Sequence, residues 1–145
     1  MNHIHTLQPP DWPRPKGYSN GILANGTAVF IAGQIGWDAE GRFPSHNLAD
    51  QVRQALSNIV EVLAQARARP EHLVRLTWYV TSRDEYMTQL KAIGKAYREV
   101  IGRHFPAMSV VEVRALMEKE AKVEIEATAV LPANQRVWPQ SAVVR

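Results

Sequence analysis

The sequence predicts an α/β (α+β) protein in which two helices cover one face of a mixed sheet. Three observations point to this class. Apolar residues recur twice at helical spacing, strand-like runs lie before, between and after these two segments, and turn residues separate the elements. A chain of 145 residues, 46% hydrophobic and 21% charged, has the composition of one ordinary globular domain.

The N-terminal part of the sequence predicts an arm followed by a hairpin. Residues 1–16 are rich in proline and show no periodicity, so we expect an extended arm before a single domain at residues 17–132. The dipeptide Asn25-Gly26 favours a tight turn and separates residues 18–24 from the β-branched run 27–32. We therefore expect these two runs to pair as a β-hairpin.

Residues 48–66 form the most regular segment of the sequence. Apolar side chains recur there at steps of four, three and four residues, which is typical of an amphipathic helix. Asn47 suits the N-cap, Asp50 falls in the first turn, and Pro70 lies just beyond the end. The predicted buried stripe consists of Val52, Leu56, Ile59 and Leu63.

The second half of the chain alternates strand and helix again. Residues 73–81 have a two-residue period and predict a strand. Ser82 and Glu85 have the spacing of a capping box, which opens a second helix that reaches Ile101. Two strand-like runs and an aperiodic C-terminal tail follow, at residues 107–116, 122–131 and 133–145.

One face of the predicted sheet lacks a cover. With both helices on one face, the other face is expected to carry Thr77 and Tyr79 from one strand and Met108 and Val110 from another. These side chains are too apolar to be left wholly in water and too polar for a simple core. In a domain of this size, such a face predicts burial against other subunits.

Composition narrows the chemistry and the compartment. The chain has no cysteine, which excludes a thiol nucleophile, a thiolate metal site and a disulfide, and suits the cytoplasm. No apolar stretch approaches the length of a membrane span, and we expect no signal peptide. The five histidines lack ligand-pair spacing, so no metal site is expected. The net charge of +3 comes from dispersed basic residues, so nucleic acid ranks last among the partners.

Two carboxylates form the most pointed chemical pattern. Alternation along the strand places Glu124 and the possible second carboxylate Glu126 on one face, with Cβ atoms about 7 Å apart. The two carboxyl groups of such a pair can have different pKa values, so that one stays ionised and acts as a general base on water. The alternative, a polar strand face that simply points at solvent, stays open. The turn from Gly33 to Gly36 could present backbone N–H groups to an anion, but a strand that ends in a loop explains it equally well.

Six separated segments resemble the RidA family, also called YjgF: residues 17–19, 29–35, 51 with 54–59, 77–81, 105–107 and 123–127. The resemblance implies a chorismate-mutase-like (bacillus-type) fold assembled as a homotrimer, with a small-molecule site in each cleft between subunits. It also implies hydrolysis of reactive enamines or imines, of the 2-iminobutanoate/2-iminopropanoate type, to 2-keto acids and ammonia without a cofactor.

The resemblance carries over to individual residues only in part. It implies that Glu124 orients the attacking water and that Tyr18 and Gly33 contact the substrate, although Ala32 replaces the family's serine. Met108 stands where the family has the arginine that grips the substrate carboxylate. The thioether of methionine offers only dispersion contacts, whereas a guanidinium group forms two charged hydrogen bonds to a carboxylate. This departure therefore predicts altered substrate specificity.

Three functions remain after this comparison. The first is hydrolysis of a bulkier or less acidic enamine or imine, an aminomuconate-like compound being one version. In this reading Trp37, Met108 and Val110 shape an apolar cleft, and Arg114 or Arg14 supplies a displaced anion contact. The second is a binding or regulatory trimer without chemistry. The third, ranked last, is endoribonuclease or translation-inhibitor activity, because no metal-binding cluster suggests phosphodiester hydrolysis.

Overall fold

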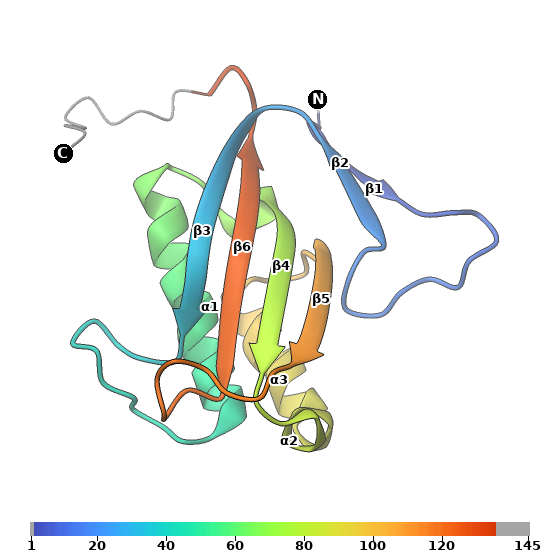
Figure 1. Ribbon diagram of the computed structural model, residues 1–145. Coiled ribbons are helices and arrows are strands. Elements are labelled where there is room, and N and C mark those ends of the chain that lie inside the picture. Colours follow the sequence, from blue (N-terminus) through green and yellow to red (C-terminus); the bar gives the residue numbers. More distant parts are fainter. Residues whose placement is uncertain (1, 136–145) are drawn as a thin grey trace.

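The computed structural model of the protein describes residues 2–135, so the last ten residues of the predicted tail lie outside the described part (Figure 1). Four strands form the main sheet: β3 (Thr27–Ile35), β4 (Leu73–Val80), β5 (Ala107–Glu112) and β6 (Val123–Leu131). Their spatial order is β3-β6-β4-β5. β6 is antiparallel to β3 and β4, whereas β5 is parallel to β4, so the predicted mixed sheet is confirmed.

Helix α1 (Leu48–Gln65) lies across one face of this sheet, as predicted (Figure 1). The Asn47 side chain accepts a hydrogen bond from the Asp50 backbone N–H at 3.2 Å, which confirms the predicted N-cap. A short 3-10 turn, η1 (Pro70–His72), then leads into β4.

The second helical segment is not one helix, which corrects the prediction of a continuous element up to Ile101. It divides into α2 (Arg83–Thr88) and α3 (Leu90–Val100) at Gln89. Ser82 caps α2 by accepting from the Glu85 N–H at 3.1 Å. At Gln89 the backbone leaves helical geometry, and its side-chain oxygen accepts from the Ala49 N–H at 3.0 Å in the first turn of α1. The break therefore satisfies a free donor of the other helix.

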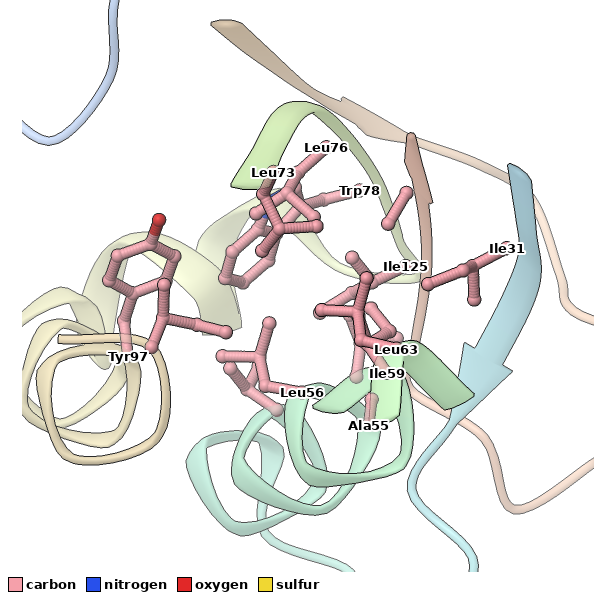
Figure 2. Packing of buried hydrophobic residues seen from close by; sticks show 14 of the residues in the cluster. Ile31, Ala55, Leu56, Ile59, Leu63, Leu73, Leu76, Trp78, Tyr97 and Ile125 are labelled. Carbon is pink, nitrogen blue, oxygen red and sulfur yellow. The ribbon is translucent and has the colours of Figure 1, made fainter. Parts of the chain in front are cut away.

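The hydrophobic core lies between the helices and the sheet (Figure 2). Leu56, Ile59 and Leu63 of α1 are fully buried, which confirms the predicted stripe. Tyr97 of α3 stacks beside Trp78 of β4 with ring centroids 6.3 Å apart. On the sheet side, the core is completed by Ile31, Leu73, Leu76, Ile125 and Ala127.

Part of the N-terminal segment forms a β-strand, although the sequence predicts an extended arm there. Strand β1 (Ile4–Leu7) pairs antiparallel with β2 (Gly21–Ala24) in a separate two-stranded sheet. The predicted hairpin between residues 18–24 and 27–32 is therefore wrong. Gly26 serves a different contact, because a Cβ at this position would lie 1.8 Å from the carbonyl oxygen of Leu131. Glycine lets the chain pass against β6 instead of turning back on β2.

Strand β5 requires two corrections. It ends at Glu112, four residues before the predicted end. In addition, Met108 is in register with Leu76, and Val110 with Trp78, so both share the helix-covered face. The expectation that they lie with Thr77 and Tyr79 is wrong. Two-residue alternation predicts which residues of one strand share a face, but the relative phase of two strands depends on their register.

Candidate functional site

The uncovered sheet face carries the two carboxylates. The neighbours of Glu124 in β6, Val123 and Ile125, are fully buried toward the helices, so Glu124 and Glu126 share the opposite face, as alternation predicts. We call this surface the open face; it carries Phe30, Ala32, Arg75, Thr77, Tyr79, Glu124, Glu126 and Thr128.

Glu124 lies against the backbone of β3. A β-bulge at Ala32 and Gly33 places both residues opposite Glu126 in the ladder with β6. A Cβ built on Gly33 would lie 2.7 Å from the carboxyl carbon of Glu124 and 3.0 Å from its Oε1. Only a glycine leaves the space that the Glu124 side chain occupies. Two residues ninety-one positions apart in the sequence are thus brought together at one place on the open face.

Glu126 has a different partner. The Tyr79 hydroxyl donates a hydrogen bond to Glu126 Oε1 at 2.8 Å. This bond raises the pKa of Tyr79 above its usual range, because the phenolate would lose the bond and face the Glu126 charge. Glu126 is therefore tied to a neighbouring phenol, whereas Glu124 has no side-chain hydrogen-bond partner within residues 2–135. Of the two carboxylates, Glu124 is the one whose two oxygens both lack a hydrogen bond in the described part of the chain, whereas Glu126 accepts one at Oε1.

A cavity of about 630 Å³ lies beside the edge strand β5 on the helix side. Three predicted site residues line it: Tyr18, Met108 and Val110. We call it the edge pocket. Trp78 of β4 and Phe105 also line it, and the helical segments contribute Tyr86, Leu90, Ile93, Gly94, Tyr97 and Arg98.

Hydrogen bonds beside β5 hold Tyr18 at this pocket. The Ser19 backbone N–H donates to the Pro106 carbonyl at 3.0 Å, and its hydroxyl donates to the Phe105 carbonyl at 2.5 Å. A parallel bridge between Ser19 and Ala107 continues this contact. The segment that carries Tyr18 is thereby fixed next to the start of the strand that carries Met108.

The other predicted residues lie elsewhere. Trp37 follows β3 and packs on Phe43 with ring centroids 6.1 Å apart, and it does not line the edge pocket. Arg114 lines a different cavity beside Lys119, and Arg14 does not line the edge pocket either. The displaced anion contact from one of these arginines stays a prediction, because the structure shows only that neither lines the edge pocket of its own chain. Lys16 and Arg98 are the cationic residues of the pocket.

Glu124 and Met108 are not brought together within the chain. β4 separates β6 from β5 in the sheet, so the two strands lie about 10 Å apart. Glu124 points to the open face, whereas Met108 packs against the core on the helix side. The chain therefore presents two separate groups of candidate residues: Glu124 with Gly33, and Tyr18 with Met108 and Val110.

Sequence reasoning missed much of the edge pocket. Leu90, Ile93 and Tyr97 have the helical spacing that is typical of a core-facing stripe, yet all three line the pocket and Leu90 is 44% exposed. The indole Nε1 of Trp78 is buried without a hydrogen-bond partner in the described part of the chain. An apolar helical period alone does not separate core residues from residues that line a cavity.

Residues 2–135 hold neither a candidate metal-binding cluster nor a helix that could span a membrane. No group of three or more histidine, aspartate or glutamate side chains there is arranged to hold a metal ion. No helix in that part is both long and apolar enough to cross a membrane.

The chain is similar to several known proteins. A family model described as Endoribonuclease L-PSP matches residues 13–131. Human 2-iminobutanoate/2-iminopropanoate deaminase is 32% identical over 114 residues, which cover 78% of this chain and 79% of the human protein. A RutC family protein of Pyrococcus horikoshii is 36% identical over 119 residues, covering 81% and 90% of the two chains. The crystal structure of YyfB, a Rid family protein of unknown function from Yersinia pestis, superimposes with a TM-score of 0.78 at 33% identity, covering 90% of this chain and 100% of YyfB.

Proposed function

The chain belongs to the YjgF/RidA family, and from that premise we propose that it hydrolyses a reactive enamine or imine in clefts between the subunits of a homotrimer. The observation that carries the proposal is the position of Glu124, an acceptor without a side-chain partner held against the glycine backbone of β3. The human relative is named as a deaminase of two imino acids, which supports the same reaction class here.

The proposed reaction converts an imine and one water into a carbonyl compound and ammonia. Glu124 orients the water and takes one of its protons as the water oxygen bonds to the imine carbon. The proton then passes to the nitrogen and gives a neutral adduct that carries one hydroxyl and one amino group. Glu124 next takes the hydroxyl proton and passes it to the nitrogen; the carbonyl forms as the carbon–nitrogen bond breaks, and ammonia leaves. No redox cofactor is needed, because no electron is gained or lost. An enamine enters the same route after it tautomerises to the imine.

Trimer assembly would complete the site. The edge pocket and Glu124 belong to opposite faces of one subunit, so a ligand in the pocket needs Glu124 from another copy. The open face also exposes Phe30 at 79%, which favours burial of this face against other subunits. The compartment that we propose is the cytoplasm, because a chain without cysteine suits a reducing environment.

Met108 in the edge pocket supports altered specificity. Its thioether packs against the core and cannot form charged hydrogen bonds to a carboxylate. We therefore propose a substrate larger or more apolar than 2-aminoacrylate, with Tyr18, Met108 and Val110 in contact with it. Trp37 would belong to this cleft only if another subunit brings it there.

The same residue favours a second candidate, a trimer that binds a small ligand without chemistry. Methionine in place of the family's arginine removes a charged contact to the substrate. That change can lower transition-state stabilisation as well as change substrate specificity. Stoichiometric binding without turnover would distinguish this candidate. RNA cleavage stays third, although the family model is described as an endoribonuclease.

The deciding experiment measures keto-acid release above the uncatalysed rate. 2-Aminoacrylate generated in situ by a dehydratase and larger imines generated by an amino-acid oxidase serve as substrates. We expect turnover of a larger imine that is lost in Glu124→Gln, and a gain on 2-aminoacrylate in Met108→Arg. Equal rates for wild type and Glu124→Gln on every accelerated substrate would overturn the role of Glu124. No acceleration of any imine would favour the binding trimer.

A further inference from the structure

We propose that the edge pocket binds a carboxylate ligand that carries an apolar group about the size of a phenyl ring. In this proposal the side chains of Arg98 and Lys16 bind the carboxylate group. This inference rests on the proposed function, because it names the substrate class of the same site. It assigns the anion contact to two residues of the pocket wall in place of position 108.

The charge of the pocket wall favours an anion. Lys16 and Arg98 are its only charged lining residues in the described part of the chain, and no carboxylate lines it. The ion pairs among residues 2–135 use other cations: Arg53, Arg69, Lys95 and Lys122. Neither cation of the pocket therefore has an ion-pair partner within residues 2–135. Both residues are exposed, so water screens part of the attraction for an anion, and the attraction depends on the two charges acting together.

Gly94 allows the Arg98 guanidinium to lie back over helix α3. These two residues are one helical turn apart, and a Cβ on Gly94 would lie 3.2 Å from Nη1 of Arg98. Glycine in a helix interior costs about 1 kcal/mol relative to alanine. At this position it leaves a shallow place on the helix where the guanidinium rests beside the pocket, with its remaining N–H groups available to a ligand.

Trp78 contributes to the apolar part of the wall. Its side chain lines the pocket and is 3% exposed. Its indole N–H has no acceptor within residues 2–135, but the nitrogen is buried away from the accessible surface, so it offers no hydrogen bond to a ligand.

The other lining residues of the edge pocket favour a large apolar group on the ligand. Leu90, Ile93, Met108 and Val110 present aliphatic or thioether groups, and Phe105 adds an aromatic face. A volume of about 630 Å³ lies in the range of pockets for drug-sized ligands. A three-carbon imino acid would leave most of this apolar surface in contact with water. A phenyl or similarly large group would bury it.

Binding of an unreactive probe tests the inference separately from catalysis. 3-Phenylpropanoate and its neutral amide have the same body and differ in charge, so calorimetric titration of the full-length protein with each measures the anion contact. We expect wild type to bind the carboxylate about tenfold more tightly than the amide, the scale of one hydrogen bond to a charged group. The double variant Arg98→Gln, Lys16→Gln should lose this preference and keep its affinity for the amide.

Lys95→Gln is the matched control, because it removes one exposed positive charge from the same helix outside the pocket. It should retain the preference. The proposal is overturned if wild type binds neither probe, if it binds both equally, or if the double variant keeps the preference. Carboxylate preference that depends on Arg98 and Lys16 without turnover of any imine would support this inference and contradict the deaminase. Turnover that is unchanged in the double variant would contradict this inference alone.

Discussion

Gly33 and Glu124 occupy one space: the Glu124 carboxyl carbon lies 2.7 Å from the point where a side chain at position 33 would begin. The contact joins the bulge of β3 to the beginning of β6, where Glu124 is the second residue of the strand. It makes the absence of a side chain at position 33 a condition for the placement of the carboxylate.

Gly33→Ala should therefore impair activity more than stability. The new methyl group meets the flexible Glu124 side chain, which can rotate away at little cost to the fold. A displacement of about 1 Å at a group that orients water can lower the rate about 100-fold. The measurement is the imine hydrolysis rate together with the melting temperature. An unchanged rate would show that Glu124 does not need this position.

Phe30 tests the assembly. Its ring is 79% exposed on the open face, directly across from Thr128. If this face is buried between subunits, Phe30→Glu places a charge in an apolar interface and should shift sedimentation from trimer to smaller species. Glu126→Gln, which changes the charge without changing the shape, is the comparison variant. A trimeric Phe30→Glu, or a wild type that sediments as a monomer at micromolar concentration, would contradict the proposed arrangement.

Gln51 should be a large contributor to stability. Its buried side chain in α1 donates to the carbonyls of Ser45 and Glu120 at 3.1 and 2.9 Å and accepts from the Lys122 N–H at 2.8 Å. Gln51→Leu would leave these three backbone groups without partners, and we expect a loss of at least about 2 kcal/mol in the free energy of unfolding. Urea denaturation measures it. Gln65→Leu at the exposed end of the same helix should change stability by less than about 0.5 kcal/mol.

His72 should make stability depend on pH. Burial lowers its pKa below the ordinary value of 6.5, and its Nδ1 accepts a hydrogen bond from the Arg69 N–H at 2.9 Å. The unfolded chain takes up a proton near pH 6.5 and the folded chain only at lower pH. The free energy of unfolding should thus fall as pH decreases from 6.5 toward the lowered pKa, and level off below it. In His72→Gln this part of the decrease should vanish; identical curves between pH 7.5 and 5 for both proteins would refute the assignment.

Local patterns predict the elements that are determined by nearby residues. The cap at Asn47, the buried stripe of α1 and the shared face of Glu124 and Glu126 are confirmed. Each depends on the helical or strand period and on hydrogen bonds within one turn. The family resemblance, carried by segments spread over the chain, is also confirmed.

Long-range pairing decides the rest. Asn25-Gly26 has the local chemistry of a hairpin, yet β2 pairs with β1 and β3 pairs with β6. The register of β5 on β4 turns Met108 toward the helices, and the break at Gln89 depends on a free N–H of α1. Strand pairing, strand register and the helix break depend on which residues far along the chain hydrogen-bond to a backbone group or cover an apolar face.

The sequence by itself thus determined the family, helix α1, the four strands of the main sheet apart from their exact ends, and the placement of two glutamates on one strand face. Only the tertiary structure decided that Gly33 makes room for Glu124, that Met108 lies on the opposite face of the sheet, and that Arg98 joins it at the edge pocket. The physical reason is that periodicity describes one element at a time, whereas a site is made where separate elements meet.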